Sequence, residues 1–166
     1  IGRVEGDKLS VSYPVRAIRT DQYLYVKNFI PSRWPVGNPE YGLLNCDNSP
    51  TKTHLINLKD DKKNGNYYDM NFGKRPEEEL YNVTNDPDCV VNLATNSAYS
   101  KIKDSLWLSL KTKLIEHQDP RILGKGEIFD YYPYSRIPRQ QKLYNKSDYN
   151  PIKLFEEKFS QKVNVN

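Results

Sequence analysis

The pair Arg33-Trp34 is the part of this 166-residue chain whose chemistry is easiest to state. A guanidinium group can form two parallel hydrogen bonds with a sulfate group, and an indole ring offers a flat surface on which a pyranose ring can stack. The pair, with Tyr41 nearby in the sequence, therefore fits a sulfated sugar. The alternative is that Trp34 packs over a β-hairpin against another domain, and the sequence leaves both interpretations open.

Other residue types that carry chemistry lack the partners that catalysis needs. His54 and His117 are far apart in the sequence, and neither belongs to a recognisable nucleophile arrangement. His117 is expected at the end of a helix, where a positive charge complements the helix dipole. Glu77 and Glu78 are expected to be solvated, with one of them paired to Arg75, because nothing marks either as the perturbed member of a catalytic acid pair. No phosphate-binding loop or dinucleotide fingerprint occurs.

The composition fits one polar domain with a core. Hydrophobic residues make up 37% of the chain and the formal net charge is +4, with lysines and arginines spread along the sequence. No nucleic-acid partner is predicted, because no zinc-finger, RNA-recognition or basic-helix signature is present. No membrane span is predicted, because no apolar run approaches about 20 residues. Cys46 and Cys89 fit no metal or redox spacing and are expected as free thiols, with one disulfide as the alternative in an exported protein.

Alternating polar and apolar residues predict the strands. Residues 11–29 fit a β-hairpin around a turn at Thr20–Gln22, in which Pro14 indicates an edge position or a strand start. A further strand is predicted at Glu79–Val83. It is followed by a turn at Asn85–Pro87, where the asparagine and aspartate side chains bond to the local backbone.

Helical periodicity predicts one long helix and several short ones. The long helix is expected to begin at a cap at Asn96 or Ser97 and to end near Gln118. Its apolar stripe consists of Tyr99, Ile102, Leu106, Leu110 and Leu114, with Trp107 beside it. A shorter helix is predicted from a Ser49 cap, with Pro50 at its first position, to about Leu58. One more helical turn is expected at Tyr67–Phe72, and a short helix after Asn150-Pro151.

Five segments resemble parts of the C-terminal region of sulfatases, and they follow one another in the order found in that family. The most specific is Glu79-Leu-Tyr-Asn82, followed by Asp86-Pro87 and by Asn92-Leu-Ala94. This run is typical of the N-sulfoglucosamine sulfohydrolase group, the heparan N-sulfatases or sulfamidases, and of its bacterial members. The five segments are Ser12–Thr20 with Tyr23–Asn28, Phe29–Pro39, Ser49–Thr51, Arg75–Ala94 and His117–Arg121.

The resemblance implies an α+β fold, in which a small antiparallel sheet of about four strands carries the long amphipathic helix packed on it. Residues 1–10 would be a linker from a missing N-terminal catalytic domain, residues 11–139 the sulfatase C-terminal subdomain, and residues 140–166 a tail with a short helix. The whole enzyme would hydrolyse sulfate esters or N-sulfates of glycans and would be periplasmic or secreted. This part would complete the substrate cleft and stabilise the catalytic domain.

Ser12-Tyr-Pro-Val-Arg16 also matches a loose form of the sulfatase nucleophile signature, S-x-P-x-R. In that family the first residue is converted to formylglycine and works beside a divalent metal, usually calcium, held by carboxylates and an amide. This chain has no pair of adjacent aspartates upstream of Ser12, and the residues after Arg16 depart from the signature. No catalytic residue, metal site or cofactor is therefore expected here, and calcium and formylglycine are expected only in the missing catalytic domain.

The resemblance adds three substrate-binding candidates to Arg33 and Trp34. In the family, the segment before the Ser-Tyr-Pro hairpin leaves the catalytic domain and can line the substrate cleft, and here that segment carries Arg3, Asp7 and Lys8. The predicted partners are the catalytic domain and a sulfated glycan. Two alternatives stay open, a stand-alone module that binds sulfated glycans and a structural module with a large apolar patch on the hairpin face.

Overall fold

The computed structural model of the chain describes residues 2–5, 8–37, 39, 49–132, 150 and 152–157. These residues form helices and antiparallel strands, so the predicted combination of helices with an antiparallel sheet is confirmed. The chain divides into two compact units. The sheet unit comprises Pro14–Ser32 and Arg75–Gly126, and the α1–α2 unit comprises Ile1–Tyr13, Arg33–Lys74 and Glu127–Asn166.

The sheet unit is built on a three-stranded antiparallel sheet. Strands β3 (Val15–Arg19) and β4 (Tyr23–Asn28) form a hairpin, and β5 (Glu78–Asn82) pairs with the other side of β4. The predicted turn and the predicted third strand are confirmed. Val11 and Ser12 do not belong to this hairpin, however, because they lie in a separate strand before Pro14, which has no backbone N–H to donate to a sheet.

The expected sheet of about four strands is not confirmed, since the described part of the sheet unit has three. Two residues lie instead at the outer edge of β5. Asn92 Oδ1 accepts a hydrogen bond from the Leu80 N–H at 2.9 Å, and the Leu93 N–H donates to the Leu80 carbonyl at 2.8 Å. Asn92 Nδ2 also donates to the Glu78 carbonyl at 3.2 Å. Because a side chain supplies two of these bonds, the segment satisfies the edge of the sheet without forming a strand.

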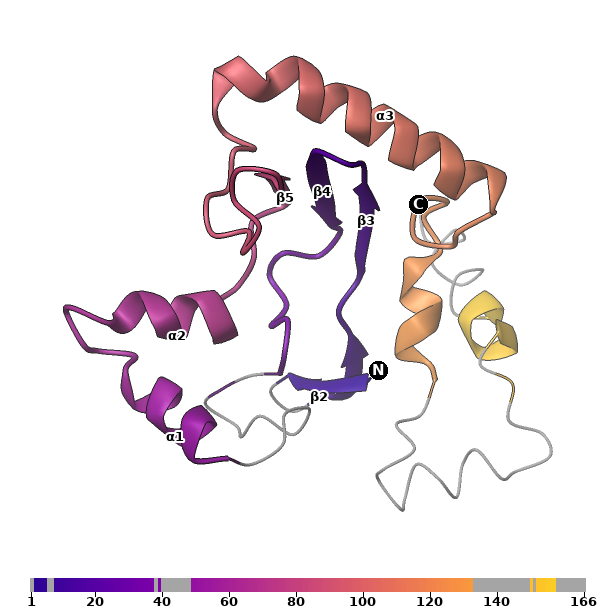
Figure 1. The fold of residues 1–166 in the computed structure, drawn as a ribbon. Helices are drawn as coiled ribbons and strands as arrows, with labels where there is room; N and C mark the ends of the chain where they lie inside the picture. Colours follow the sequence, from indigo (N-terminus) through magenta and orange to yellow (C-terminus); the bar gives the residue numbers. More distant parts are fainter. Residues whose placement is uncertain are drawn as a thin grey trace. The chain divides into compact units, whose positions relative to one another are not determined.

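Helix α3 (Ser100–Glu116) packs on one face of this sheet (Figure 1). One 3₁₀ turn, η2 (Ser97–Tyr99), precedes it, and Asn96 caps that turn by accepting the Ala98 N–H at 3.0 Å. The buried core consists of Tyr25, Leu80, Leu110 and Leu114. The predicted cap and the predicted apolar stripe are therefore confirmed.

The α1–α2 unit combines a small hairpin with two short helices. Strands β1 (Gly2–Glu5) and β2 (Lys8–Ser12) pair antiparallel, and they begin within residues 1–10, the segment predicted to be a linker. Helix α1 (Pro50–Asn57) begins as predicted, since Ser49 Oγ accepts the Lys52 N–H at 3.1 Å.

Helix α2 (Gly65–Phe72) extends the single helical turn that the sequence predicts. Its residues Tyr68 and Phe72 form a small core with Val36, Leu55 and Ile56.

The C-terminal part of the chain adds two short helical segments. The 3₁₀ helix η3 covers Gly126–Asp130, and residues 152–157 form a helix whose Asn150 cap accepts the N–H groups of Ile152 and Lys153. Phe155 is buried, and its ring meets the ring of Tyr131 edge-on with centroids 6.1 Å apart. The predicted tail helix is thus confirmed. None of the helices in the described residues has the length and apolar character that crossing a membrane requires.

Candidate functional site

Arg33, the predicted sulfate-binding residue, lies in the α1–α2 unit and is already paired. Its Nη2 donates to Asp130 Oδ2 at 2.6 Å, and its Nη1 donates to Asp130 Oδ1 at 3.0 Å and to the Ser12 carbonyl at 2.7 Å. The Arg33 and Asp130 side chains are only 17% and 19% exposed. A sulfate group that bound Arg33 in the same two-pronged geometry would have to displace the Asp130 carboxylate.

Ser12 belongs to the same hydrogen-bond network. Its N–H donates to Asp130 Oδ1 at 3.0 Å, its Oγ–H donates to the same oxygen at 3.1 Å, and the residue is 8% exposed. Asp130 therefore joins the end of β2 to the loop that carries Arg33. The Ser12 hydroxyl therefore helps to hold that loop in place through Asp130.

The ammonium group of Lys74 lies over the indole ring of Trp34. The Lys74 Nζ lies 4.9 Å from the centroid of the indole, within the range of a cation–π interaction. Trp34 is half-buried, whereas Lys74 is exposed. An anionic sugar that reached Trp34 would meet this ammonium group, so the site suits an acidic sugar better than a neutral one.

Two of the three N-terminal candidates lie in strands of the α1–α2 unit. Arg3 lies in β1 opposite Val11, and Lys8 begins β2 opposite Glu5. Asp7 lies outside the described residues, as do Tyr41 and Cys46. Lys8 and Ser12 share strand β2, so the predicted N-terminal segment leads directly into the Arg33 network.

Asp130 and Lys74, the two partners of the predicted pair, could not be identified from the sequence. Asp130 is 97 positions from Arg33 along the chain. A contact across such a distance leaves no local pattern, since any of the many carboxylates could have been the partner. The only available signal was the expectation that a half-buried guanidinium needs a counter-charge.

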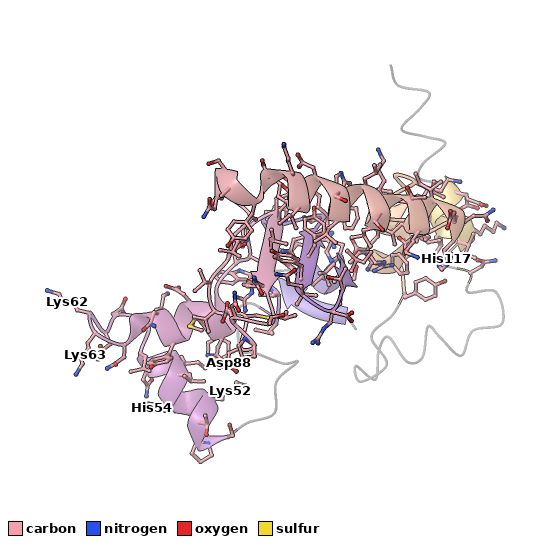
Figure 2. All side chains as sticks on the ribbon, turned by 45° about the horizontal axis from the view of Figure 1, so that its top comes forward. Lys52, His54, Lys62, Lys63, Asp88 and His117 are labelled. Carbon is pink, nitrogen blue, oxygen red and sulfur yellow. The ribbon has the colours of Figure 1, made fainter. Side chains whose placement is uncertain are left out.

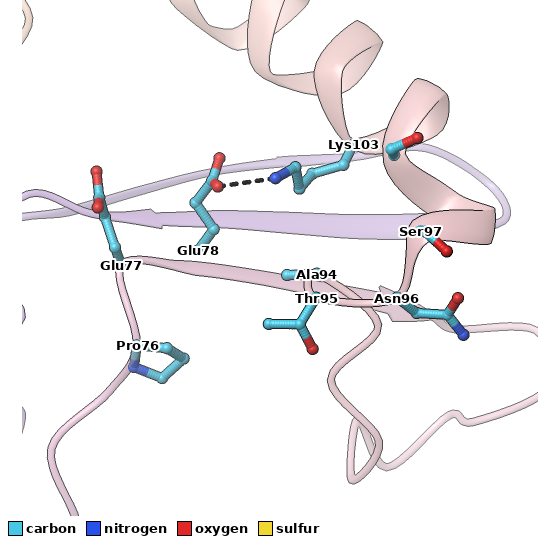
Figure 3. A pocket seen from close by; sticks show the side chains of 9 residues that line it. Pro76, Glu77, Glu78, Ala94, Thr95, Asn96, Ser97 and Lys103 are labelled. Atoms are coloured by element: carbon cyan, nitrogen blue, oxygen red, sulfur yellow. Dashed lines mark hydrogen bonds and ion pairs between the residues drawn. The ribbon is translucent and has the colours of Figure 1, made fainter.

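A pocket of about 540 Å³ in the sheet unit is a second candidate site. It lies where β5 begins and α3 starts, and Figure 3 shows the Lys103 ammonium bonded to Glu78 Oε2 at 3.0 Å. Its lining residues are Pro76, Glu77, Glu78, Ala94, Thr95, Asn96, Ser97, Ser100 and Lys103.

The charged groups of this pocket form a closed network. Partial burial alone would raise the pKa of Glu78, but hydrogen bonds from Tyr25 and Lys103, together with the charges of Lys103 and Lys27, lower it below the usual value. Burial raises the pKa of Tyr25, and its 2.7 Å hydrogen bond to Glu78 raises it further. Glu78 therefore stays ionised and Tyr25 stays protonated at neutral pH. Neither group is poised for general acid–base catalysis, which needs a pKa near the working pH.

Residues 79–94 form the segment with the most specific resemblance. The polar groups described below bond to other groups of the sheet unit. Glu79 is buried and accepts hydrogen bonds from Asn28 Nδ2 at 2.7 Å and from the Tyr81 hydroxyl at 2.6 Å. The Asp86 carboxylate accepts from two backbone N–H groups of the following turn, at 3.1 and 2.8 Å. These residue types build the strand and the turn, so their role is in folding.

An ion pair connects the first and the last of the resembling segments. Arg16, in β3, donates through Nε to Asp119 Oδ2 at 2.7 Å and through Nη2 to the same oxygen. Asp119 follows α3, and its Oδ1 accepts the Arg121 N–H at 2.8 Å. The pair fixes the end of the long helix to the edge strand of the sheet.

Comparison with known proteins found no family model that matches the chain and no significant match to a curated protein. Within the described residues, no group of three or more histidine, cysteine, aspartate or glutamate side chains is arranged to hold a metal ion. The function is therefore inferred from the residues and their geometry.

Proposed function

We propose that this chain is the C-terminal subdomain of a sulfatase that acts on sulfated glycans, of the N-sulfoglucosamine sulfohydrolase type. In that role it completes the substrate cleft and stabilises the catalytic domain, and it does not itself break a sulfur–oxygen or sulfur–nitrogen bond. The nucleophile, as formylglycine, and the calcium ion belong to the catalytic domain of the whole enzyme. Such an enzyme is periplasmic or secreted.

The observation that carries the proposal is that the resembling segments contact one another. Arg16 of the first segment pairs with Asp119 of the last, and Asn28 bonds to Glu79 of the fourth. These partners are 103 and 51 positions apart along the chain. These two contacts join three of the five segments, the first, the fourth and the fifth, within one sheet unit, which is the arrangement expected if the three segments belong to one inherited fold.

The face of the sheet turned away from α3 is where the catalytic domain would pack. Side chains alternate along β3 and β4, so Val15, Ala17, Leu24 and Val26 lie opposite the face that packs on α3. Val15 is 37% exposed and Ala17 is also exposed, while Leu24 and Val26 are half-buried. The same face carries Arg19, Asn28 and Glu79, so a catalytic domain that packed on it would meet both apolar and polar side chains.

The test compares the isolated chain with the longer protein encoded by the same gene. We expect the reading frame upstream to encode a C-x-P-S-R or S-x-P-S-R motif. The longer protein, produced with formylglycine formation and calcium, should hydrolyse an aryl sulfate or N-sulfoglucosamine, and the isolated chain should show no turnover. Clear turnover by the isolated chain, or an upstream frame without such a motif, would refute the proposal.

A stand-alone module that binds sulfated glycans is the second candidate function. The position of the Lys74 ammonium over the Trp34 ring favours it, because it supplies a positive charge beside the predicted aromatic residue. The isolated chain should then bind heparin, and Trp34→Ala should lower that affinity. Unchanged heparin affinity in Trp34→Ala would exclude Trp34 as the anchor of such a module.

A further inference from the structure

Asn64 and Gly65 lie where the turn between α1 and α2 meets the start of α2, and they form the only Asn-Gly pair in the sequence. Because glycine has no side chain to shield its backbone nitrogen, that nitrogen can attack the side chain of the preceding asparagine. Lys62 and Lys63 extend from the same turn away from both helices (Figure 2), and both are exposed. Water therefore reaches this turn, so a side chain here can be hydrolysed.

The reaction open to this pair is deamidation, with water as the other reactant. The Gly65 nitrogen bonds to Cγ of Asn64, and the amide group of that side chain leaves as ammonia, taking up the proton of the Gly65 N–H. The product is a five-membered succinimide ring. Water then adds to either carbonyl carbon of the ring and breaks its bond to the Gly65 nitrogen. Attack at Cγ gives aspartate, and attack at the main-chain carbon gives isoaspartate.

The folded turn keeps the Gly65 nitrogen away from its target. Asn64 has φ −120° and ψ 5°, so the Gly65 nitrogen is nearly eclipsed with the Asn64 nitrogen and is turned away from Asn64 Cβ. The Gly65 N–H also donates to the Asp61 carbonyl at 2.8 Å. Ring closure therefore requires rotation about the Cα–C bond of Asn64 and loss of this hydrogen bond.

The Asp61 carboxylate holds the turn in its closed form. Its Oδ1 accepts the N–H groups of Asn64 and Lys63, at 2.7 and 2.8 Å. These two bonds lower the pKa of Asp61, and a smaller contribution comes from the Asn64 side chain. The adjacent Asp60 is exposed, and its carboxylate accepts no hydrogen bond within the described part of the chain. Asp61 and Asp60 therefore carry the same charge but differ in their hold on the turn.

The turn can open locally because the helix that follows it has a small core. Helix α2 buries two side chains, those of Tyr68 and Phe72. Segments that bury few apolar side chains open at a lower free energy than the centre of a large core. Since ring closure occurs only in the open turn, the rate of deamidation is the intrinsic rate of the Asn-Gly pair multiplied by the fraction of open turn.

We propose that Asn64 is a site of spontaneous deamidation and that the hydrogen bonds of Asp61 set its rate. The inference is independent of the proposed function. A carboxylate at position 64 adds a negative charge beside Asp61 and cannot donate a hydrogen bond to it, so the two groups repel each other. In isoaspartate the main chain gains a carbon atom, which moves the first N–H groups of α2 out of position. Because ammonia is lost, the modified turn does not return to its original form.

Peptide mass spectrometry of the full 166-residue chain, incubated at mildly alkaline pH, tests the proposal. Asn64 should convert faster than Asn66 and Asn71, which are exposed on the same helix but precede aromatic residues. In the urea-unfolded chain the conversion of Asn64 should be at least about tenfold faster, because the folded turn is closed for most of the time. Enzymatic methyl labelling detects the isoaspartate product, and hydrogen exchange should show lost protection of α2 in that product.

Three variants separate the chemistry from the turn that controls it. Asp61→Ala should raise the rate in the folded chain about tenfold, since two hydrogen bonds that close the turn are lost. The matched control, Asp60→Ala, removes the same charge and should change the rate less than about twofold. Gly65→Ala should nearly abolish conversion in the folded and the unfolded chain alike. Its methyl group would lie 3.4 and 3.5 Å from the carbonyl oxygens of Leu58 and Lys59, so the turn can accommodate it.

Three results would overturn the proposal. These are conversion of Asn64 in the folded chain no faster than that of Asn66 and Asn71, equal rates in the folded and the urea-unfolded chain, and equal acceleration by Asp61→Ala and Asp60→Ala. Circular dichroism verifies folding of each variant. If Asp61→Ala loses helix, Asp61→Asn repeats the comparison, because its amide oxygen still accepts hydrogen bonds and the acceleration should be smaller.

Discussion

The sheet unit and the α1–α2 unit use their polar side chains in different ways. In the sheet unit, Glu79 and Asn92 bond to neighbouring strands and turns, and Asp119 bonds to the edge strand. In the α1–α2 unit, Lys62 and Lys63 extend into solvent. Most residues of the five resembling segments build the sheet unit, whereas these exposed lysines of the α1–α2 unit belong to none of the five segments.

The two units also differ in the size of their cores. Tyr25 and Leu80 are fully buried in the sheet unit, and two leucines of α3 complete its core. In the α1–α2 unit, the buried hydrophobic residues of the described part are Tyr68, Phe72 and Phe155, and Phe155 lies outside the cluster formed by the other two. Since stability rises with the apolar area removed from water, the sheet unit should be the more stable of the two.

The largest effect is expected from Leu80→Ala. Removing this fully buried side chain should lower the free energy of unfolding by about 3 kcal/mol, because the transfer energy of the side chain is lost and a cavity remains. Urea unfolding followed by circular dichroism measures it. Leu108→Ala, at a position 65% exposed, is the control and should stay within about 0.5 kcal/mol of the natural chain. A loss below about 1 kcal/mol for Leu80→Ala would show that the sheet unit does not depend on this core.

Asn92→Ala tests whether polar side chains hold the sheet unit together. The change removes acceptors for the N–H groups of Leu80 and Ala94 and the donor to the Glu78 carbonyl. We expect a loss of about 2 kcal/mol in the same unfolding measurement, because backbone groups at the sheet edge lose their partners. Asn92→Asp keeps the acceptors and loses only the donor, so it should cost less than half as much. Equal losses in the two variants would contradict the role given to the Asn92 oxygen.

The Arg16–Asp119 pair can be measured by a double-mutant cycle. Arg16→Ala, Asp119→Ala and the double variant should give a coupling energy of about 1 kcal/mol, since both side chains are partly shielded from water. The coupling should fall at high salt as the charges are screened. A coupling energy of zero would mean that the contact between the first and last resembling segments does not stabilise the fold.

Ser49→Ala gives the corresponding test in the α1–α2 unit. It removes the oxygen that accepts the Lys52 N–H and should destabilise α1 by about 1 kcal/mol. Hydrogen exchange should show faster exchange in α1, with unchanged protection of β4 in the sheet unit. Ser49→Asp should retain the protection of α1. Loss of protection throughout the sheet unit after Ser49→Ala would show that the two units do not unfold separately.

The smallest effect is expected at alkaline pH. The pKa of Tyr25 is raised in the folded chain by burial and by Glu78, so between the unfolded pKa of about 10 and the higher folded value the unfolded state has lost a proton that the folded state keeps. The contribution of Tyr25 to the free energy of unfolding is therefore fully present below about pH 10. It falls above that pH, by at most about 1 kcal/mol at pH 10.5. Tyr25→Phe should flatten the decline measured by urea unfolding. Part of the slope should remain, because burial and Glu79 also raise the pKa of Tyr81. A slope equal to that of the natural chain would contradict the assignment to Tyr25.

Much of the secondary structure could be predicted because its signals are local. The three- and four-residue spacing of Leu106, Leu110 and Leu114 defines α3, and a serine before a proline defines the start of α1. Two features could not be predicted, namely the break between β2 and β3 at Pro14 and the hydrogen bonding of Asn92 and Leu93 to the outer edge of β5. Both depend on which distant backbone groups still lack a hydrogen-bond partner. Asn92 reads as an ordinary turn residue until its position beside Leu80 is known.

The candidate sites were harder to predict than the fold. Arg33 and Trp34 were recognised from residue type alone, but their partners Asp130 and Lys74 are set by tertiary structure. Lys62 and Lys63 were counted with the other lysines as scattered surface charge. That Tyr67 faces outward could be known only once Tyr68 and Phe72 were seen to face the core.

The way Asn92 and Leu93 cover β5 also bears on self-association. An uncovered outer strand can recruit the strand of another molecule and begin fibre growth. Around Leu80 that route is blocked, since its N–H and carbonyl are already bonded within the chain. On the opposite margin, β3 carries the exposed Arg19, a charged side chain of the kind that discourages pairing with a second copy.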